Sequence, residues 1–220
     1  DAGYRVSIIS PKGRGHEASY EKLEGIEIYR HKIHEASGVA GYFVEYAGAL
    51  AAQFWLALKI YRRTRFRVLH VGNPPDFLFV LGLFFRLFGV RFIYEFLDLN
   101  PELYLVKFGR RDLIYKTLCF LERCSFRSAH AVLAANESYR AIAMERGSVP
   151  PERAFILLGT PQPERIRIQP PRIELKEGRA YLVIYLGVMG PQDGVDLLLT
   201  SIDHITRGRG RRDVFFAIIG

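Results

Sequence analysis

The chain of 220 residues is poor in residues that build metal and disulfide sites, with only two cysteines. Cys119 and Cys124 lie close together in a segment of helical periodicity, so their side chains point to different faces and cannot readily bridge. No Cys/His spacing typical of a metal site occurs in the sequence. We therefore expect no metal and a reducing, cytoplasmic environment.

Long apolar runs are also missing. The most apolar stretch, 77–90, is interrupted by Arg86, and a membrane-spanning helix needs about 20 apolar residues. This stretch therefore predicts a buried core helix, and no signal peptide is visible. The sequence begins at Asp1 without Met and stops at Gly220 directly after an apolar run. We interpret it as a segment of a longer protein.

The composition is that of an ordinary globular protein, with 49% hydrophobic and 25% charged residues. Basic residues number 31 and acidic residues 23, which gives a net charge of +8. Such a balance favours anionic partners such as nucleotides, acidic lipid surfaces or nucleic acid. Because no nucleic-acid motif or basic recognition helix is present, we expect no nucleic-acid partner.

Strand and helix patterns alternate along most of the chain. Apolar and β-branched runs predict strands over 6–9, 25–29, 66–71, 92–94, 131–135 and 155–158. Helical patterns cover 41–63, 77–90, 113–126 and 136–147, the last capped by Asn136. This alternation predicts an α/β fold with a parallel sheet and helices on both faces.

A second α/β unit is expected near the end of the chain. Residues 161–179 are rich in proline and lack an apolar period, as is typical of a linker. A strand over 181–186, a helix over 195–205 and a strand over 214–219 follow. We therefore divide the chain into a first domain over 1–160, the linker, and the start of a second domain over 180–220.

The stretch 91–109 combines a buried strand with clustered carboxylates. Glu95, Asp98 and Glu102 follow its apolar run, and Asn100-Pro101 resembles a helix N-cap with proline at the first helical position. Asn73-Pro74 repeats the same pattern after the preceding strand. In open α/β sheets ligands bind outside the carboxyl ends of the strands. Asp98 and Glu102 are either paired acid/base groups, or Glu102 only favours the positive helix start.

Two further patterns could bind anions. The glycine-rich turn 187–194 could hold a phosphate through backbone N–H groups, although it is neither GxGxxG nor a P-loop, and a plain tight turn is the alternative. The second pattern is a set of basic residues interleaved with aromatic ones. They form either a solvated helix face or, as a set, a contact for an anionic membrane surface, to which each basic residue would contribute about 1 kcal/mol of binding free energy. They are Lys107, Arg110, Arg111, Lys116, Arg123 and Arg127.

Several short motifs together resemble family 4 glycosyltransferases of the GT-B fold. They are HVGNPPD (70–76), YEFLDLNPELY (94–104), KFGRRD (107–112), AANESYR (134–140), ERGSVPPERAF (145–155) and YLGVMGPQDGVDLLL (185–199). The combination is more specific than any one motif. The chain is most similar to the subgroup associated with exopolysaccharide and other cell-surface glycan synthesis.

The resemblance implies two Rossmann-like domains that face each other across a cleft. The N-terminal domain mainly receives a glycan or lipid-linked acceptor, and the C-terminal domain holds a nucleotide-diphosphate sugar. Transfer retains the anomeric configuration and needs neither metal nor other cofactor. The resemblance places the enzyme in the cytoplasm or peripherally on the inner membrane face. The family's first strand would precede Asp1 and most of its donor domain would follow Gly220, so we expect the segment alone to be inactive.

The resemblance also implies roles for individual residues. We expect catalytic roles for Asp98 and Glu102. The positions that match acceptor-side loops are Asn73, Asp76, Glu95, Asn136 and Ser138. The positions that match the donor-phosphate loop are Gly187, Met189 and Gly190.

The chain departs from the family pattern at three positions. Many relatives carry a histidine where Leu97 stands, and Arg and Lys where Val188 and Asp193 stand. These departures remove groups that would contact the sugar and the diphosphate. They motivate the alternative that the chain is a non-catalytic Rossmann-like module that binds a nucleotide or a partner.

Overall fold

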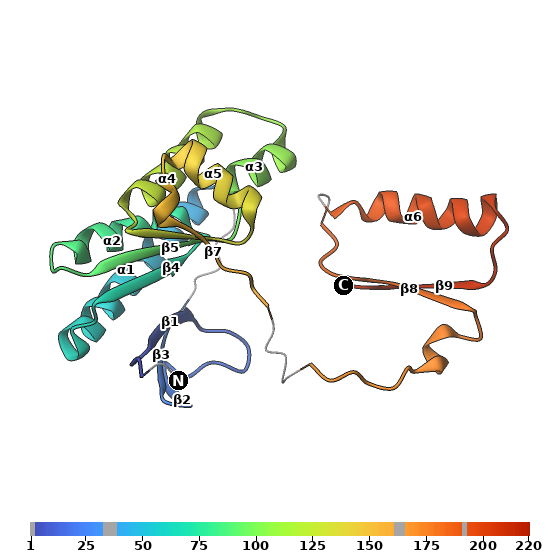
Figure 1. Cartoon of the computed structure of the whole chain (residues 1–220), viewed down its shortest axis with the longest axis horizontal. Helices are drawn as coiled ribbons and strands as arrows, with labels where there is room; N and C mark the ends of the chain where they lie inside the picture. Colours follow the sequence, from blue (N-terminus) through green and yellow to red (C-terminus); the bar gives the residue numbers. More distant parts are fainter. Residues whose placement is uncertain (1–2, 33–38, 161–165, 191–192) are drawn as a thin grey trace. The chain divides into compact units, whose positions relative to one another are not determined.

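The computed structural model describes residues 3–32, 39–160, 166–190 and 193–220, with the backbone alone over 39–46. The chain divides into two compact units (Figure 1). Unit 1 comprises Asp1–Asp98 and Leu118–Leu158, and unit 2 comprises Leu99–Thr117 and Gly159–Gly220. Each unit is described by itself.

Unit 1 begins with a small mixed sheet of β1 (Ser7–Pro11), β2 (Tyr20–Leu23) and β3 (Ile26–His31). Its strand order is β1-β3-β2, with β1 parallel and β2 antiparallel to β3. Glu24 and Gly25, which join β2 to β3, both have positive φ angles, of 48° and 86°. A two-residue hairpin needs such angles to match the twist of its strands.

A second, all-parallel sheet carries the rest of unit 1. Its order is β4-β5-β6-β7, with β4 at Val68–Gly72, β5 at Arg91–Phe96, β6 at Ala131–Ala134 and β7 at Ala154–Ile156. The accompanying helices are α1 (Val39–Thr64), α2 (Phe79–Arg86), α4 (Leu113–Ser128, of which the part from Leu118 belongs to unit 1) and α5 (Glu137–Gly147). Short 3₁₀ turns cover Asp76–Leu78 and Pro151–Arg153. The expected α/β class with a parallel sheet is confirmed.

One face of β5 forms the centre of this sheet's core. Phe92, Tyr94 and Phe96 are almost completely buried, whereas the alternating residues of the strand are not. Phe126 of α4 packs edge-on against the rings of Tyr94 and Phe96, at centroid distances of 5.6 and 4.9 Å. Tyr139 of α5 contacts Phe96 at 5.3 Å. The period-2 pattern of β5 thus selects the face on which α4 and α5 pack.

Helix α2 meets the same face of β5 and also packs against α1. Gly82 of α2 lies directly against the Phe92 ring. Ala57 of α1 joins Leu81 and Phe85 of α2 in one buried apolar cluster. The prediction of a helix within 77–90 is confirmed, with the helix ending at Arg86. Its burial is limited to one face, since Val80 and Leu83 are exposed.

Unit 2 contains α3 (Asn100–Phe108) and a βαβ arrangement at the end of the chain. Strands β8 (Tyr181–Leu186) and β9 (Val214–Ile219) pair in parallel along their full length, as expected from the sequence. Between them run α6 (Val195–Asp203) and a π-helical turn over His204–Gly208. A 3₁₀ turn covers Ile173–Lys176 of the predicted linker, and residues 161–165 of that linker lie outside the described residues.

The contact between Gly82 and Phe92 predicts opposite effects for two glycine-to-alanine changes. A Cβ at position 82 would lie 2.5 Å from the buried Phe92 ring, whereas a Cβ at Gly48 of α1 would meet nothing within 4 Å. Gly82→Ala should lower the free energy of unfolding by about 1–3 kcal/mol through overpacking. Gly48→Ala should raise it by about 0.5–1 kcal/mol through helix propensity. Urea unfolding followed by circular dichroism measures both, and equal effects would contradict this packing.

His130 predicts a pH dependence of stability. Its Nδ1 accepts a hydrogen bond from the backbone N–H of Phe92 at 3.0 Å. Burial lowers the pKa of His130, and the nearby cations Arg86, Arg153 and Arg91 lower it further. The unfolded chain therefore binds a proton more readily, so stability is complete above the ordinary histidine pKa of about 6.5 and falls as the pH drops below it.

The comparison of wild type with His130→Gln isolates this contribution. Glutamine offers an acceptor oxygen and does not titrate. Between pH 7.5 and 5.5, the urea midpoint of the wild type should fall more than that of the variant. Equal falls in the two proteins would show that His130 does not carry the effect.

Candidate functional site

One buried amide side chain joins the carboxyl ends of β4 and β5. Asn73, which follows β4, is only 2% exposed. Its Oδ1 accepts hydrogen bonds from the backbone N–H groups of Leu97 (2.7 Å) and Asp98 (3.1 Å). Its Nδ2 donates to the backbone oxygen of Asp98 (2.7 Å) and to Oδ1 of Asp76 (3.0 Å). The segment after β5 is therefore held by a residue far away in sequence.

Asp76 extends this network into the core. The Tyr94 hydroxyl donates to Oδ1 of Asp76 at 2.6 Å, and the Ser125 hydroxyl donates to the backbone oxygen of Asp76, also at 2.6 Å. Burial raises the pKa of Tyr94 far above its ordinary value, and the Asp76 carboxylate raises it further. Tyr94 therefore stays protonated and donates to a carboxylate, which is a strong type of hydrogen bond.

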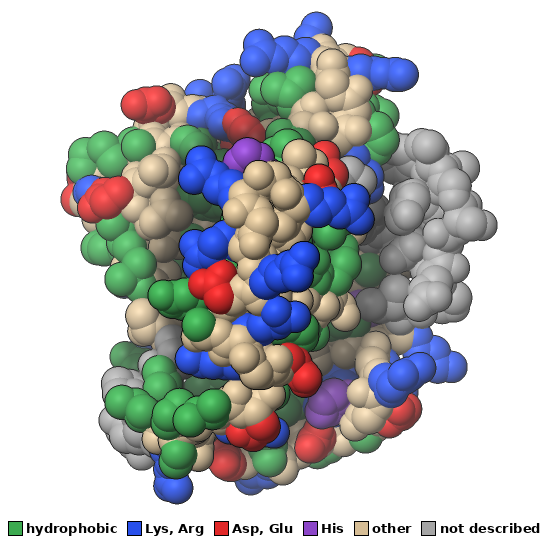
Figure 2. Space-filling view, turned by 90° about the vertical axis from the view of Figure 1, so that its right-hand side faces the viewer, with side chains coloured by type: hydrophobic (Ala, Val, Ile, Leu, Met, Phe, Trp, Pro, Cys, Tyr) green, Lys and Arg blue, Asp and Glu red, His purple; other side chains and the backbone are tan. Residues whose placement is uncertain are grey.

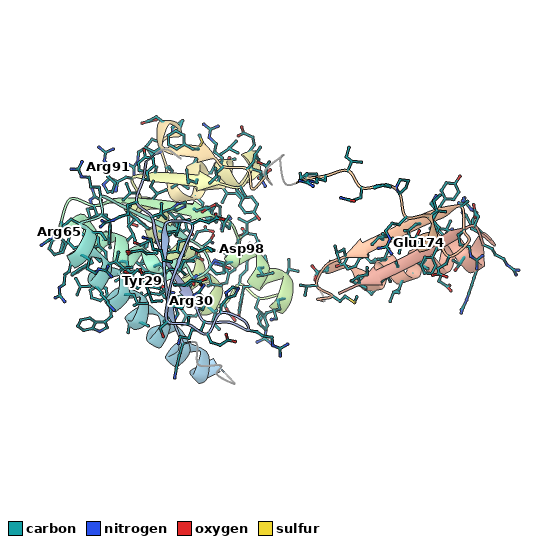
Figure 3. The ribbon with its side chains drawn as sticks, turned by 90° about the horizontal axis from the view of Figure 1, so that it is seen from below. Tyr29, Arg30, Arg65, Arg91, Asp98 and Glu174 are labelled. Atoms are coloured by element: carbon teal, nitrogen blue, oxygen red, sulfur yellow. The ribbon has the colours of Figure 1, made fainter. Side chains whose placement is uncertain are left out.

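The same edge of the sheet carries two accessible titratable groups and the Asp98 side chain. Asp98 is exposed, while its backbone is fixed by Asn73 (Figure 3). Oε2 of Glu95 lies 2.8 Å from Nε2 of His70, and these side chains are 25% and 44% exposed. A histidine–carboxylate pair of this kind can hold or move a proton.

His70 is a site residue that the sequence analysis missed. In the parallel register of β4 and β5, Gly72 is opposite Glu95, and His70 is opposite Ile93. Since alternate residues share a face, His70 and Glu95 project from the same face of neighbouring strands. The sequence does not show that β4 and β5 are neighbours in this register, and this pairing is what brings the two side chains together.

The acceptor-side residues predicted at these strand ends, together with the predicted catalytic Asp98, thus fall into two environments. Asn73 and Asp76 are buried and hold the loops, whereas Glu95 and Asp98 reach solvent. Their contact with an acceptor stays a prediction. Glu102 lies in the first turn of α3 in unit 2, and Asp98 lies in unit 1. Their proposed pairing also stays a prediction.

Asn136 and Ser138 lie after β6, at the start of α5. Oδ1 of Asn136 accepts from the backbone N–H of Tyr139 at 3.0 Å, so the predicted N-cap is confirmed. Ser138 is exposed in the first turn.

The predicted N-cap role of Asn100 is wrong. Leu99 occupies the cap position of α3, and Asn100 is already its first helical residue, followed by Pro101. The pattern at Asn73 also differs, because the Asn73–Pro74 and Pro74–Pro75 bonds are cis and the following 3₁₀ turn begins only at Asp76. The two Asn-Pro sequences therefore form different turns.

In the glycine-rich turn of unit 2, a backbone N–H group is bonded to the carboxylate of Asp193, a residue of the same turn. The backbone N–H of Gly190 donates to Oδ2 of Asp193 at 2.7 Å, and that of Gly187 donates to the backbone oxygen of Ile219 at 3.1 Å. Met189 is about half-exposed. Two N–H groups of the predicted donor loop are thus bonded within the protein. Pro191 and Gln192 of this turn lie outside the described residues.

Helix α3 and the start of α4 form a segment with exposed basic and apolar side chains, here named the basic hairpin (residues 103–116). Gly109 ends α3 in the left-handed conformation, and Oδ1 of Asp112 accepts from the backbone N–H groups of Ile114 and Tyr115. The Tyr104 hydroxyl donates to the other oxygen of Asp112 at 2.9 Å and lowers the pKa of that carboxyl. Figure 2 shows Lys and Arg side chains interspersed with hydrophobic ones on the face that it draws.

The described part of the chain contains no group of His, Cys, Asp and Glu side chains arranged to hold a metal ion. Among the described helices, none has the length and apolarity needed to cross a membrane.

Comparison with known protein families assigns the first 159 residues, which include all of unit 1 and the α3 segment of unit 2. A family model described as a glycosyl transferase 4-like domain matches residues 1–159. The chain belongs to this family. The match includes all strands from β1 to β7, so the family's Rossmann-like domain corresponds to the sheets described above. No curated protein matches the chain.

As a glycosyl transferase 4-like domain, the chain carries its accessible polar groups where this fold class binds ligands, at the carboxyl ends of parallel strands. The expected transferase class is thereby supported.

The buried bond between Tyr94 and Asp76 predicts a stability difference between two tyrosine variants. Tyr94→Phe removes a donor from a buried carboxylate and should lower the free energy of unfolding by about 1.5–3 kcal/mol. Tyr104→Phe removes a bond to the more accessible Asp112 in the basic hairpin and should cost less than about 1 kcal/mol. Urea unfolding of both variants tests the ranking, and a reversed order would contradict it.

Proposed function

We propose that this protein transfers a sugar from a nucleotide-diphosphate sugar to a glycan or lipid-linked acceptor, with retention, in cell-surface polysaccharide synthesis. The observation that carries the proposal is a glycosyl transferase 4-like domain whose exposed Asp98 is held at the strand ends by Asn73. Exopolysaccharide synthesis is the process that the sequence motifs favour.

In the proposed reaction, an acceptor hydroxyl oxygen bonds to the anomeric carbon while the bond from that carbon to the diphosphate breaks. The hydroxyl proton passes to the departing phosphate. Such a step depends on oriented N–H groups and positive charge more than on a protein nucleophile. Gly187, Met189 and Gly190 would contact the donor phosphates.

Asp98 is proposed to orient and polarise the acceptor, with Glu102 as the second carboxylate. Glu95, with its partner His70, and Ser138 would contact acceptor hydroxyl groups. Asn73, Asp76 and Asn136 would act through the loops and the helix start that they hold, because their side chains bond the backbone or one another.

Asp98→Asn in the protein expressed from its complete gene should reduce turnover about tenfold or more, because the polarising charge is lost. Its unfolding curve should not change, since the backbone bonds of residue 98 to Asn73 remain. Glu174→Gln is the matched control, because Glu174 is an exposed carboxylate whose ion-pair partner among the described residues is the exposed Arg172. Unchanged turnover in Asp98→Asn would remove this residue from the site.

The competing candidate is a non-catalytic module that binds a nucleotide or a partner. It is favoured by the Asp193 carboxylate on the Gly190 N–H, where a phosphate would otherwise bind. A panel of nucleotide sugars separates the two candidates. Sugar transfer supports the enzyme, and nucleotide binding without transfer to any acceptor supports the module.

For the membrane partner, we propose that the basic hairpin contacts an anionic lipid surface, where a lipid-linked acceptor would be found. Val106, Phe108 and Leu113 are 67%, 52% and 79% exposed, and they lie close together in the chain, so they form a group of exposed apolar side chains. They alternate with exposed cations that can bind acidic headgroups while the apolar groups enter the interface. These cations are Lys107, Arg110, Arg111 and Lys116, with Arg123 and Arg127 further along α4.

Replacing Arg110 and Arg111 by Gln should weaken binding to phosphatidylglycerol-containing vesicles, measured by co-sedimentation, by about thirtyfold, because the two basic residues together contribute about 2 kcal/mol. The matched control replaces Arg209 and Arg212, which removes the same charge elsewhere. Binding by the wild type should also fall as salt increases. Equal losses in the two double variants would show that only net charge matters.

A further inference from the structure

A pocket of about 410 Å³ opens on unit 1 between the β2–β3 hairpin and α1. Tyr29 and Arg30 lie together on β3 beside α1 (Figure 3). The volume is within the range of about 300–1,000 Å³ that is usual for small-molecule sites. None of the residues that line the pocket belongs to the network around Asn73.

The charged and polar groups at the floor of the pocket are paired with one another. The Arg30 side chain is only 6% exposed, and its Nη2 lies 2.6 Å from Oε2 of Glu21. The Tyr29 hydroxyl donates to Glu27 at 2.9 Å and accepts from Nη1 of Arg63 at 2.8 Å. The Arg63–Tyr29 bond joins the hairpin to α1, whereas the other two bonds lie within the small sheet.

The rim, in contrast, carries positive charge that the protein does not neutralise. Lys59 and Arg63 are one helical turn apart on the same face of α1. Lys59 is exposed and forms no ion pair within the described ranges. Arg63 is 55% exposed, and its nearest approach to the Glu27 carboxylate is a long 3.7 Å. An anion at the rim would therefore meet one unpaired and one partly paired cation.

An aromatic surface lies beside these cations. Tyr20 is 48% exposed, and its ring leans against Tyr29 at a centroid distance of 5.1 Å. The Ser19 hydroxyl and the Leu56 side chain complete the wall. An aromatic ring such as Tyr20 can pack against the C–H face of a sugar ring. The hydroxyl groups of the pocket can form hydrogen bonds with a polyhydroxylated ligand, and Lys59 can pair with a carboxylate or phosphate.

We propose that this pocket binds an acidic sugar unit of the glycan acceptor, that is, a sugar ring bearing a carboxylate or phosphate. The sugar ring packs on Tyr20 and its anionic group contacts Lys59 and Arg63. This proposal rests on the proposed transferase function and narrows its acceptor to an acidic glycan. The pocket binds the acceptor chain away from the reacting group.

The test measures binding without any sugar donor, by isothermal titration calorimetry. The probes are a galacturonic acid oligosaccharide and the neutral galactose oligosaccharide of the same length. The wild type should bind the acidic probe more tightly. Lys59→Gln should weaken that binding about fivefold, the size of a charge pair at an exposed site, and leave the neutral probe unaffected. Tyr20→Ala should weaken both probes.

Two controls keep the test specific. Arg62→Gln removes a neighbouring charge of α1 that does not line the pocket, and it should leave both affinities unchanged. Lys59→Arg should restore binding of the acidic probe. Equal affinities for the two probes, an unchanged affinity in Lys59→Gln, or an equal loss in Arg62→Gln would each overturn the proposal.

Because the measurement needs no turnover, its outcome is separate from the proposed activity. Specific binding of the acidic probe without sugar transfer would overturn the transferase proposal and retain the pocket. Sugar transfer without specific binding of the acidic probe to this pocket would overturn the pocket proposal and retain the transferase proposal.

Discussion

The amide of Asn73 is the interaction on which the candidate site depends. It exchanges hydrogen bonds with both the N–H and the C=O of Asp98, and it also bonds Leu97 and Asp76. A buried backbone group without a partner costs about 1–3 kcal/mol, so the loops after β4 and β5 keep their shape only while this side chain stays in place. The position of Asp98 therefore depends on a residue from another strand.

Much of the fold was predictable because apolar runs bounded by turn residues specify buried strands. Tyr181–Leu186 and Val214–Ile219 are found at the expected residues. Strand β2 was missed because its sequence, YEKL, is mostly polar, and it forms only by pairing with β3 across the turn at Glu24 and Gly25. The start of α3 was misplaced because the backbone before it is bonded to Asn73, and sequence proximity alone suggested that Asn100 is the cap.

The candidate site was predictable in location more than in its internal arrangement. The rule that ligands bind at the carboxyl ends of parallel strands identified the segments of Asn73 and Asp98. It could not separate Asn73 and Asp76, which are buried, from Glu95 and Asp98, which reach solvent. That separation depends on which strand lies beside which. The glycosyl transferase 4-like family assignment supports the resemblance but does not supply these contacts.

The only tryptophan of the chain, Trp55, lies on α1 directly before Leu56, which lines the pocket between α1 and the β2–β3 hairpin, and is 65% exposed. Its indole ring is already largely hydrated in the folded protein, so its emission should change little when the chain unfolds. A ligand that covers this part of α1 would instead alter the surroundings of the ring. The protein thus carries an intrinsic fluorophore that is more sensitive to what covers this surface than to global folding.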